Sequence, residues 1–170
     1  MNKNDFRVRL PLWNIALLVI LLIWTYGVVY MSNMLFKNFE GVFGLNDETV
    51  VINFDKLALL SIILGAVLLL IFLVSYYLKL NKHNKENPNS KLPILAFFKL
   101  GEYIEEDEMF NQVTQQATKK VYTFYSQILP LLLLIMIFPL NRFVFIICVF
   151  LMLILQNVLY YRQMIKFIEA

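Results

Sequence analysis

Four long apolar segments dominate this chain and limit the folds that it can adopt. Each has close to the roughly 20 residues that a helix needs to cross about 30 Å of hydrocarbon at about 1.5 Å per residue. A segment in lipid must satisfy its own backbone hydrogen bonds, so we expect four helices. The segments are residues 12–32, 57–78, 121–140 and 143–161. The pattern predicts an all-α membrane protein with four transmembrane helices.

The charge content also favours a protein that is exposed to lipid. Charged residues make up 16% of the chain, whereas soluble domains carry about 25%. The formal net charge of +3 is too small to indicate a nucleic-acid partner. Cys148 is the single cysteine and His83 the single histidine, so we expect no internal disulfide, no metal site and no cofactor.

The first apolar segment follows three basic residues, as the hydrophobic region of a signal peptide does. It is longer, however, than the roughly 7–15 residues of such a region. The residues after it are bulky and form no cleavage pattern of small residues. We therefore expect an uncleaved membrane anchor.

The distribution of lysine and arginine predicts the orientation in the membrane. If the segments cross in alternate directions, twelve basic residues fall on one side and three on the other. Cytoplasmic loops carry the excess of such residues, so both termini are expected in the cytoplasm and the chain in the cell membrane. The predicted order is a cytoplasmic N-terminus (1–11), a first span (12–32), an extracellular loop (33–56), a second span (57–78), a cytoplasmic loop (79–120), a third span (121–140), a short outer turn (141–142), a fourth span (143–161) and a cytoplasmic tail (162–170).

The long cytoplasmic loop is expected to contain three parts. Residues 79–91 are rich in Asn, Lys, Pro and Ser, which favours a flexible linker. The apolar run that follows, up to Leu100, either lies in the inner interface as an amphipathic segment or packs against the helix bundle. From Glu102 no Gly or Pro occurs before Pro130. This predicts one helix that starts in the cytoplasm and continues into the third span.

Four adjacent acidic residues lie at the start of that predicted helix: Glu105, Glu106, Asp107 and Glu108. The helix dipole favours anions in the first turns. Successive helical side chains point about 100° apart, so the four carboxylates do not converge on one cation. We expect a solvated helix start, with a docking surface for a basic partner and a metal site as the alternatives.

Uncharged polar residues mark the third and fourth segments. Gln127 lies about 13 residues before the connecting turn, and Gln156 and Asn157 lie about 13 residues after it. At equal depth we expect Gln127 to form a hydrogen bond with Gln156 or Asn157. A polar patch that contacts a ligand or another subunit is the alternative. Pro130 is expected to kink the third helix one turn beyond Gln127.

Small residues and turn residues mark two further features. Ser61 and Gly65 form a pair of small residues four positions apart, which lets another helix approach closely, either inside the bundle or in a partner. In the outer loop the β-prone runs VFGL and TVVINF flank NDE, which predicts a small hairpin. Asp55 is expected to cap the second helix.

The stretch EEDEMFNQVTQQATKKVYTFYSQILPLLLLIMIF resembles a pattern in small uncharacterised membrane proteins of low-GC Gram-positive bacteria. Members often carry a cytoplasmic Asp-Glu-Arg, then a polar helical run and a pair of spans. Asp107 and Glu108 match the first two positions, whereas Met109 stands in place of the arginine. The resemblance implies a four-span architecture. Some proteins of this kind accompany toxin, bacteriocin or secretion loci as immunity or accessory subunits.

No Asp, Glu, Lys, Arg or His lies near the middle of any predicted span. Pumps and ion-coupled transporters usually place ionisable groups there, so we expect neither ion pumping nor enzymatic activity. We expect an accessory or immunity-type subunit for a toxin or a secretion system, which contacts the bilayer and either a protein partner or further copies of itself. The alternative is a small oligomeric transporter or channel component for a neutral or lipid-like substrate.

Overall fold

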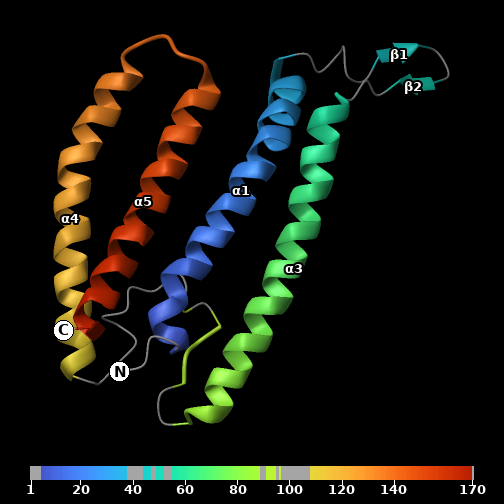
Figure 1. Ribbon diagram of the computed structural model, residues 1–170. Coiled ribbons are helices and arrows are strands. Elements are labelled where there is room, and N and C mark those ends of the chain that lie inside the picture. The colour runs from blue at the N-terminus through green and yellow to red at the C-terminus, as the bar shows by residue number, and fades with distance from the viewer. Residues whose placement is uncertain are drawn as a thin grey trace. The chain divides into compact units, whose positions relative to one another are not determined.

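The computed structural model describes residues 5–37, 44–46, 49–51, 55–88, 91–94, 96 and 108–169. Within these ranges the chain forms four helices (Figure 1). They are α1 (Phe6–Lys37), α3 (Lys56–Glu86), α4 (Glu108–Met136) and α5 (Arg142–Glu169). The expectation of an all-α chain with four long helices is confirmed.

Three of the helices are long and apolar enough to cross a membrane, by length and composition. The qualifying segments are Phe6–Met34 in α1, Lys56–Glu86 in α3 and Arg142–Phe167 in α5. The helix α4 contains the third predicted span, but it ends at Met136 rather than at residue 140. From Val121 to Met136 it covers about 24 Å, less than the roughly 30 Å of a hydrocarbon core.

Three helices begin with the same kind of cap. The carboxylate of Asp55 accepts a hydrogen bond from the backbone N–H of Leu57 at 3.2 Å, which confirms the predicted cap of α3. Asp5 accepts one from the N–H of Arg7 at 3.1 Å, and Asn141 one from the N–H of Phe143 at 3.1 Å. Each side chain satisfies one of the N–H groups that a helix start leaves without an internal partner.

Two short strands follow α1. In β1 (Gly44–Asn46) and β2 (Thr49–Val51) the residues pair antiparallel, with Leu45 opposite Val50. The strands lie in the outer-loop segment for which the sequence predicts a hairpin. Residues 47 and 48, where its turn was expected, lie outside the described residues.

The helix α3 continues through most of the segment that was expected to be a flexible linker. It ends at Glu86, and the N–H of Asn87 still donates to the carbonyl of His83 at 2.9 Å. Although this segment is mostly polar, the side chains of Leu80 and His83 are buried. They follow the buried Tyr76 at helical spacing and so continue the buried face of α3. The linker prediction is therefore wrong for residues 79–86.

The chain divides into two compact units. The larger unit contains Met1–Leu18 and Phe72–Ala170, and the smaller unit contains Val19–Ile71. In the smaller unit the second half of α1 packs against the first half of α3. In the larger unit the first turns of α1 meet α4 and α5 in a cluster of Val8, Val113 and Met164, whose side chains are at most 1% exposed.

Candidate functional site

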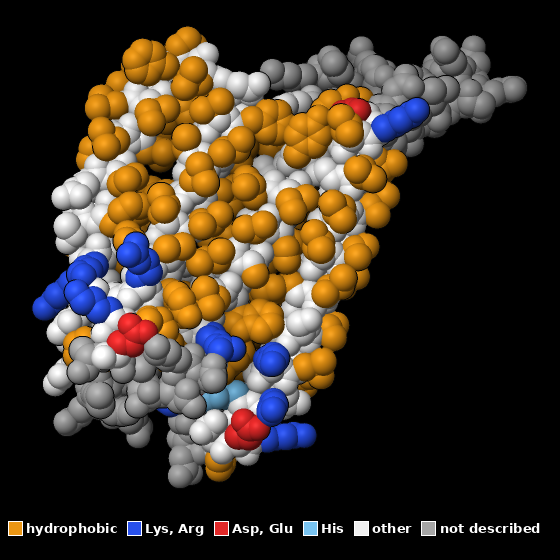
Figure 2. Space-filling model, viewed as in Figure 1, with side chains coloured by type: hydrophobic (Ala, Val, Ile, Leu, Met, Phe, Trp, Pro, Cys, Tyr) orange, Lys and Arg blue, Asp and Glu red, His pale blue; other side chains and the backbone are white. Residues whose placement is uncertain are grey.

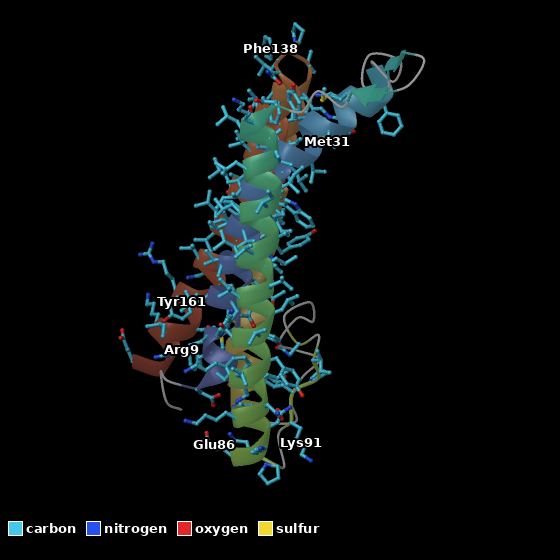
Figure 3. All side chains as sticks on the ribbon, turned by 90° about the vertical axis from the view of Figure 1, so that its right-hand side faces the viewer. Arg9, Met31, Glu86, Lys91, Phe138 and Tyr161 are labelled. Atoms are coloured by element: carbon cyan, nitrogen blue, oxygen red, sulfur yellow. The ribbon has the colours of Figure 1, made fainter. Side chains whose placement is uncertain are left out.

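The larger unit gathers distant parts of the chain at one end, which we call the common end. The cluster of Val8, Val113 and Met164 joins the start of α1, the start of α4 and the last turns of α5. The last turns of α3 are also present, because the ring of Phe6 lies 5.8 Å from that of Tyr76. Figure 3 shows Arg9, Glu86 and Lys91 at this end, with Phe138 at the opposite end of the unit.

A set of aromatic rings connects α1 to α3 beside the common end. The ring of Trp13 lies 5.6 Å from both Phe72 and Tyr76, and Phe6 lies 6.2 Å from Trp13. These centroid distances and the mostly tilted planes are those that aromatic pairs prefer. The rings hold the first turns of α1 and the last turns of α3 in a fixed register.

One polar group lies next to these rings. Arg7 donates to Asp5 at 2.6 Å, and Asp5 lies 3.9 Å from Nδ1 of His83. His83 is only 6% exposed, its ring lies 5.7 Å from Phe6, and its Nε2 has no hydrogen-bond partner among the residues that the structure describes. In the described ranges no three His, Cys, Asp or Glu residues form a set that could hold a metal ion.

Two hydrogen bonds at the common end join the last turns of α3 to the segment that follows this helix. The side-chain amide of Asn84 donates to the carbonyl of Leu92 at 2.9 Å and accepts from its N–H at 2.8 Å. Leu92 and Ala96 are buried, whereas Ile94 is exposed. The start of the apolar run therefore packs on the protein, and residues 97–100, where its interfacial part was expected, lie outside the described ranges.

The ionisation of Asp5 yields a prediction about acid stability. Burial alone would raise the pKa of Asp5, but the hydrogen bonds and the charge of Arg7, together with His83, outweigh burial and lower this pKa below its ordinary value of 3.8. A lowered carboxyl pKa stabilises the fold at pH values above the ordinary pKa, and the benefit is lost as the pH falls through the lowered value. We expect Trp fluorescence in a neutral detergent to stay constant from about pH 7 to 5 and to change below about pH 4.

The control for this titration is Asp5→Asn, which keeps the shape of the cap but cannot ionise. The difference between the two titration curves isolates Asp5 from the other acidic residues. A difference centred above about pH 5 would show that the pKa of Asp5 is raised rather than lowered, against this account.

The helices α4 and α5 contact each other through side chains along their length. The hydroxyl of Tyr125 donates to the side-chain oxygen of Gln156, and Lys120 donates to Gln163 at 2.6 Å. Asn157 donates to the carbonyl of Leu153 in its own helix at 2.9 Å. The predicted bond from Gln127 to Gln156 or Asn157 is therefore wrong. Tyr125, two residues before Gln127, reaches Gln156 instead, whereas Gln127 lies about 200° around α4 from Tyr125 and is exposed.

The bond between Tyr125 and Gln156 predicts a modest loss of stability on Tyr125→Phe. In a membrane environment an interhelical hydrogen bond contributes about 0.6–2 kcal/mol. The melting temperature of the detergent-solubilised protein should fall accordingly, by a few degrees at most. Tyr122→Phe is the matched control, because Tyr122 is 75% exposed. Equal melting temperatures for the two variants would contradict the role assigned to this bond.

In the smaller unit Ser61 and Gly65 lie against α1. The hydroxyl of Ser61 donates to the carbonyl of Ile23 at 2.7 Å and accepts from the N–H of Gly27 at 3.1 Å. A Cβ atom at Gly65 would lie 2.8 Å from the Cβ of Trp24. The small-residue pair thus packs inside the chain, which is one of the two roles expected for it. Its partner Gly27 was missed, although a lone glycine in an apolar helix is itself a signal of close packing.

The acidic cluster lies at the edge of the described part of the chain. Glu105, Glu106 and Asp107 fall outside it, and Glu108 is the first residue of α4. Sequence reasoning also missed Asp5 and His83, which the fold brings together from positions far apart along the chain. A scan against protein-family models and searches of curated proteins and of solved structures found no match to this chain.

Proposed function

We propose that this chain is a multi-pass membrane protein whose four helices all span the bilayer, with both termini in the cytoplasm. The supporting observation is the exposed surface of α3. Its exposed apolar side chains extend over roughly 200° of the helix circumference, at about 100° per residue. Among the most exposed are Leu60 at 62%, Leu70 at 64% and Leu78 at 62%. A soluble helix turns polar side chains outward, whereas lipid accepts apolar ones.

The surface of the other helices has the same character. Figure 2 shows hydrophobic side chains over most of the visible surface of the helices, with most of the Lys and Arg side chains in the lower half of the view. Large apolar side chains are also exposed on α5, among them Ile147, Leu151 and Leu155. The helix α4 is included as the fourth span because it packs against α5 and is joined to it by a short turn at residues 137–141.

The common end supports the relative placement of the termini. The first turns of α1 and the last turns of α5 share the cluster of Val8 and Met164, which supports the proposal that both ends of the chain lie on one side of the membrane. The ends of the middle loop, at the end of α3 and the start of α4, lie there as well. Twelve of the fifteen basic residues flank this side, which assigns it to the cytoplasm.

The proposed activity is contact with another protein, as an accessory or immunity-type subunit for a toxin or a secretion system. No Asp, Glu, Lys, Arg or His lies near the middle of any predicted span, so the bilayer region offers packing surfaces rather than a proton or ion relay. The resemblance of the stretch from Glu105 to Phe138 points to this class of partner. A pore for a neutral or lipid-like substrate is the second candidate, because such a substrate needs no charged relay.

A pull-down with reconstitution tests this function. A tagged chain is extracted from bacterial membranes in a gentle detergent, and bound proteins are identified and then tagged for reciprocal capture. A protein that captures this chain in return supports the contact function. A chain that binds only itself and carries a neutral solute across liposomes supports the pore. A quadruple variant (E105Q, E106Q, D107N, E108Q) tests whether a basic partner docks on the acidic cluster.

A further inference from the structure

The helix α4 has two faces of opposite character. Val113, Ala117 and Val121 recur at helical spacing, are buried, and lie on the side that faces α5. The opposite face is exposed and polar for four turns. Its residues, which we call the polar stripe, are Gln112, Gln116, Lys119, Thr123, Ser126 and Gln127. In a chain whose other helices expose apolar side chains, this face requires its own explanation.

Part of the polar stripe lies at membrane depth, given the four-span arrangement proposed above, on which this inference rests. Lys119 and Lys120 mark the cytoplasmic boundary of α4. Thr123 lies about 6 Å beyond Lys119 along the helix axis, and Gln127 about 12 Å beyond it. No water is available at that depth to bond an exposed carboxamide, and such an unpaired group costs several kcal/mol in hydrocarbon.

Two polar groups of the stripe, the carboxamide of Gln127 and the carbonyl of Ser126, differ from the rest. The hydroxyls of Thr123 and Ser126 donate to carbonyls of their own helix at 3.0 and 2.8 Å. The carboxamide of Gln127 has no hydrogen-bond partner within the part of the chain that the structure describes. Pro130, also exposed, has no N–H, so the carbonyl of Ser126 loses its regular helical donor. The carboxamide of Gln127 and a carbonyl without its regular helical donor thus lie one residue apart.

We propose that the polar stripe is the contact face between two copies of this chain, with Gln127 of each copy donating to the Ser126 carbonyl of the other. Two copies inserted in the same orientation place these groups at the same depth. In a two-fold symmetric contact, if Gln127 of one copy meets Ser126 of the other, the reverse pair also forms, so each donor has an acceptor. Neighbouring helices commonly satisfy the carbonyls that proline frees in membranes.

The remaining residues of the stripe fit a contact centred on Gln127 and Pro130. Thr123 and Ser126 are small enough for two helices to approach closely. Lys119 faces Lys119 of the second copy, and this like-charge pair favours helices that cross near Gln127 and diverge toward the headgroups. There the two ammonium groups reach water and anionic lipid, where their repulsion is screened.

Disulfide crosslinking in native membranes tests the contact. Cys148 is first replaced by alanine, and single cysteines are then introduced as Thr123→Cys on the stripe and as Leu129→Cys, which lies within about 3 Å of the depth of Gln127 but about 160° away from it around α4. With a membrane-permeant oxidant we expect a dimer of two copies from Thr123→Cys and little from Leu129→Cys. Gln127→Leu in the Thr123→Cys background removes both symmetric bonds, so the dimer association constant should fall about threefold per bond and roughly eightfold in all.

The outcomes separate this inference from the function on which it rests. Gln127→Asn, which keeps a carboxamide, should restore part of the crosslinking that Gln127→Leu removes. Three results, obtained with the chain still in the membrane fraction, would overturn the two-copy contact. They are a crosslink of Thr123→Cys to a different protein, equal crosslinking at both positions, and no effect of Gln127→Leu. Recovery of the chain in the soluble fraction would instead overturn the four-span proposal.

Discussion

Replacing Met164 by alanine is expected to destabilise the larger unit by about 2–5 kcal/mol, the range for a buried methionine truncated in a packed core. Met164 is 1% exposed and lies against Val8 and Val113, so it joins three helices at the common end. This end carries most of the charged residues, and water is the alternative environment for its apolar side chains. The hydrophobic effect therefore acts here with its full strength, whereas between helices in lipid it contributes little.

The matched control is Met136→Ala, because Met136 is 54% exposed near the end of α4. Both variants are purified in the same detergent, and the fraction that remains monodisperse is followed against temperature by size-exclusion chromatography. We expect a large drop in midpoint for Met164→Ala and a small one for Met136→Ala. Similar midpoints would contradict the assignment of Met164 to a packed core at the common end.

The second large effect is expected for Gly27→Leu in the smaller unit. A Cβ atom at Gly27 would lie 2.6 Å from the backbone carbonyl oxygen of Ala58 and 2.5 Å from Cγ1 of Ile62. A backbone oxygen cannot rotate away as a side chain can, so α1 and α3 must separate. The separation breaks both hydrogen bonds of Ser61 to α1. Overpacking of this kind costs about 1–3 kcal/mol, and the lost bonds add to it.

Ala16→Leu provides the control for this substitution, because Ala16 is exposed on the same helix. The measurement is the thermal midpoint in detergent, supported by limited proteolysis of the loop between α1 and α3. We expect a lower midpoint and faster cleavage for Gly27→Leu, and values close to those of the unmodified protein for Ala16→Leu. If Gly27→Leu behaves like Ala16→Leu, the close approach of the helices at Gly27 is wrong.

The fold was predictable from the sequence where a single physical constraint dominates. A long apolar segment must form a helix in lipid, so the four helices follow from the hydropathy pattern alone. Caps are also local, and Asp55 could be assigned because it directly precedes its helix. The linker prediction failed for residues 79–86 because Asn and Lys are polar on average. One buried face, formed by Leu80 and His83, is enough to continue the helix.

Contacts between helices were less predictable, because they depend on how each helix is rotated about its own axis as well as on the position of a residue along that axis. The sequence predicts matching depths for Gln127 and Gln156, but the face of α4 toward α5 carries Tyr125, so Tyr125 reaches Gln156. Ser61 was recognisable as a packing residue, whereas its partner Gly27 depends on the register between α1 and α3. The group of Asp5, Arg7 and His83 depends on the tertiary fold in the same way, because its members come from the start of α1 and the end of α3.

The most direct test of the account is cysteine accessibility in intact cells. In a background with Cys148 replaced by alanine, single cysteines are introduced as Pro139→Cys in the turn between α4 and α5 and as Glu169→Cys near the C-terminus. A membrane-impermeant maleimide added to intact bacterial cells should label Pro139→Cys at once and Glu169→Cys only after the membrane is opened. Labelling of Glu169→Cys from outside intact cells, or of both positions equally, would contradict a chain that crosses the bilayer four times with both termini inside.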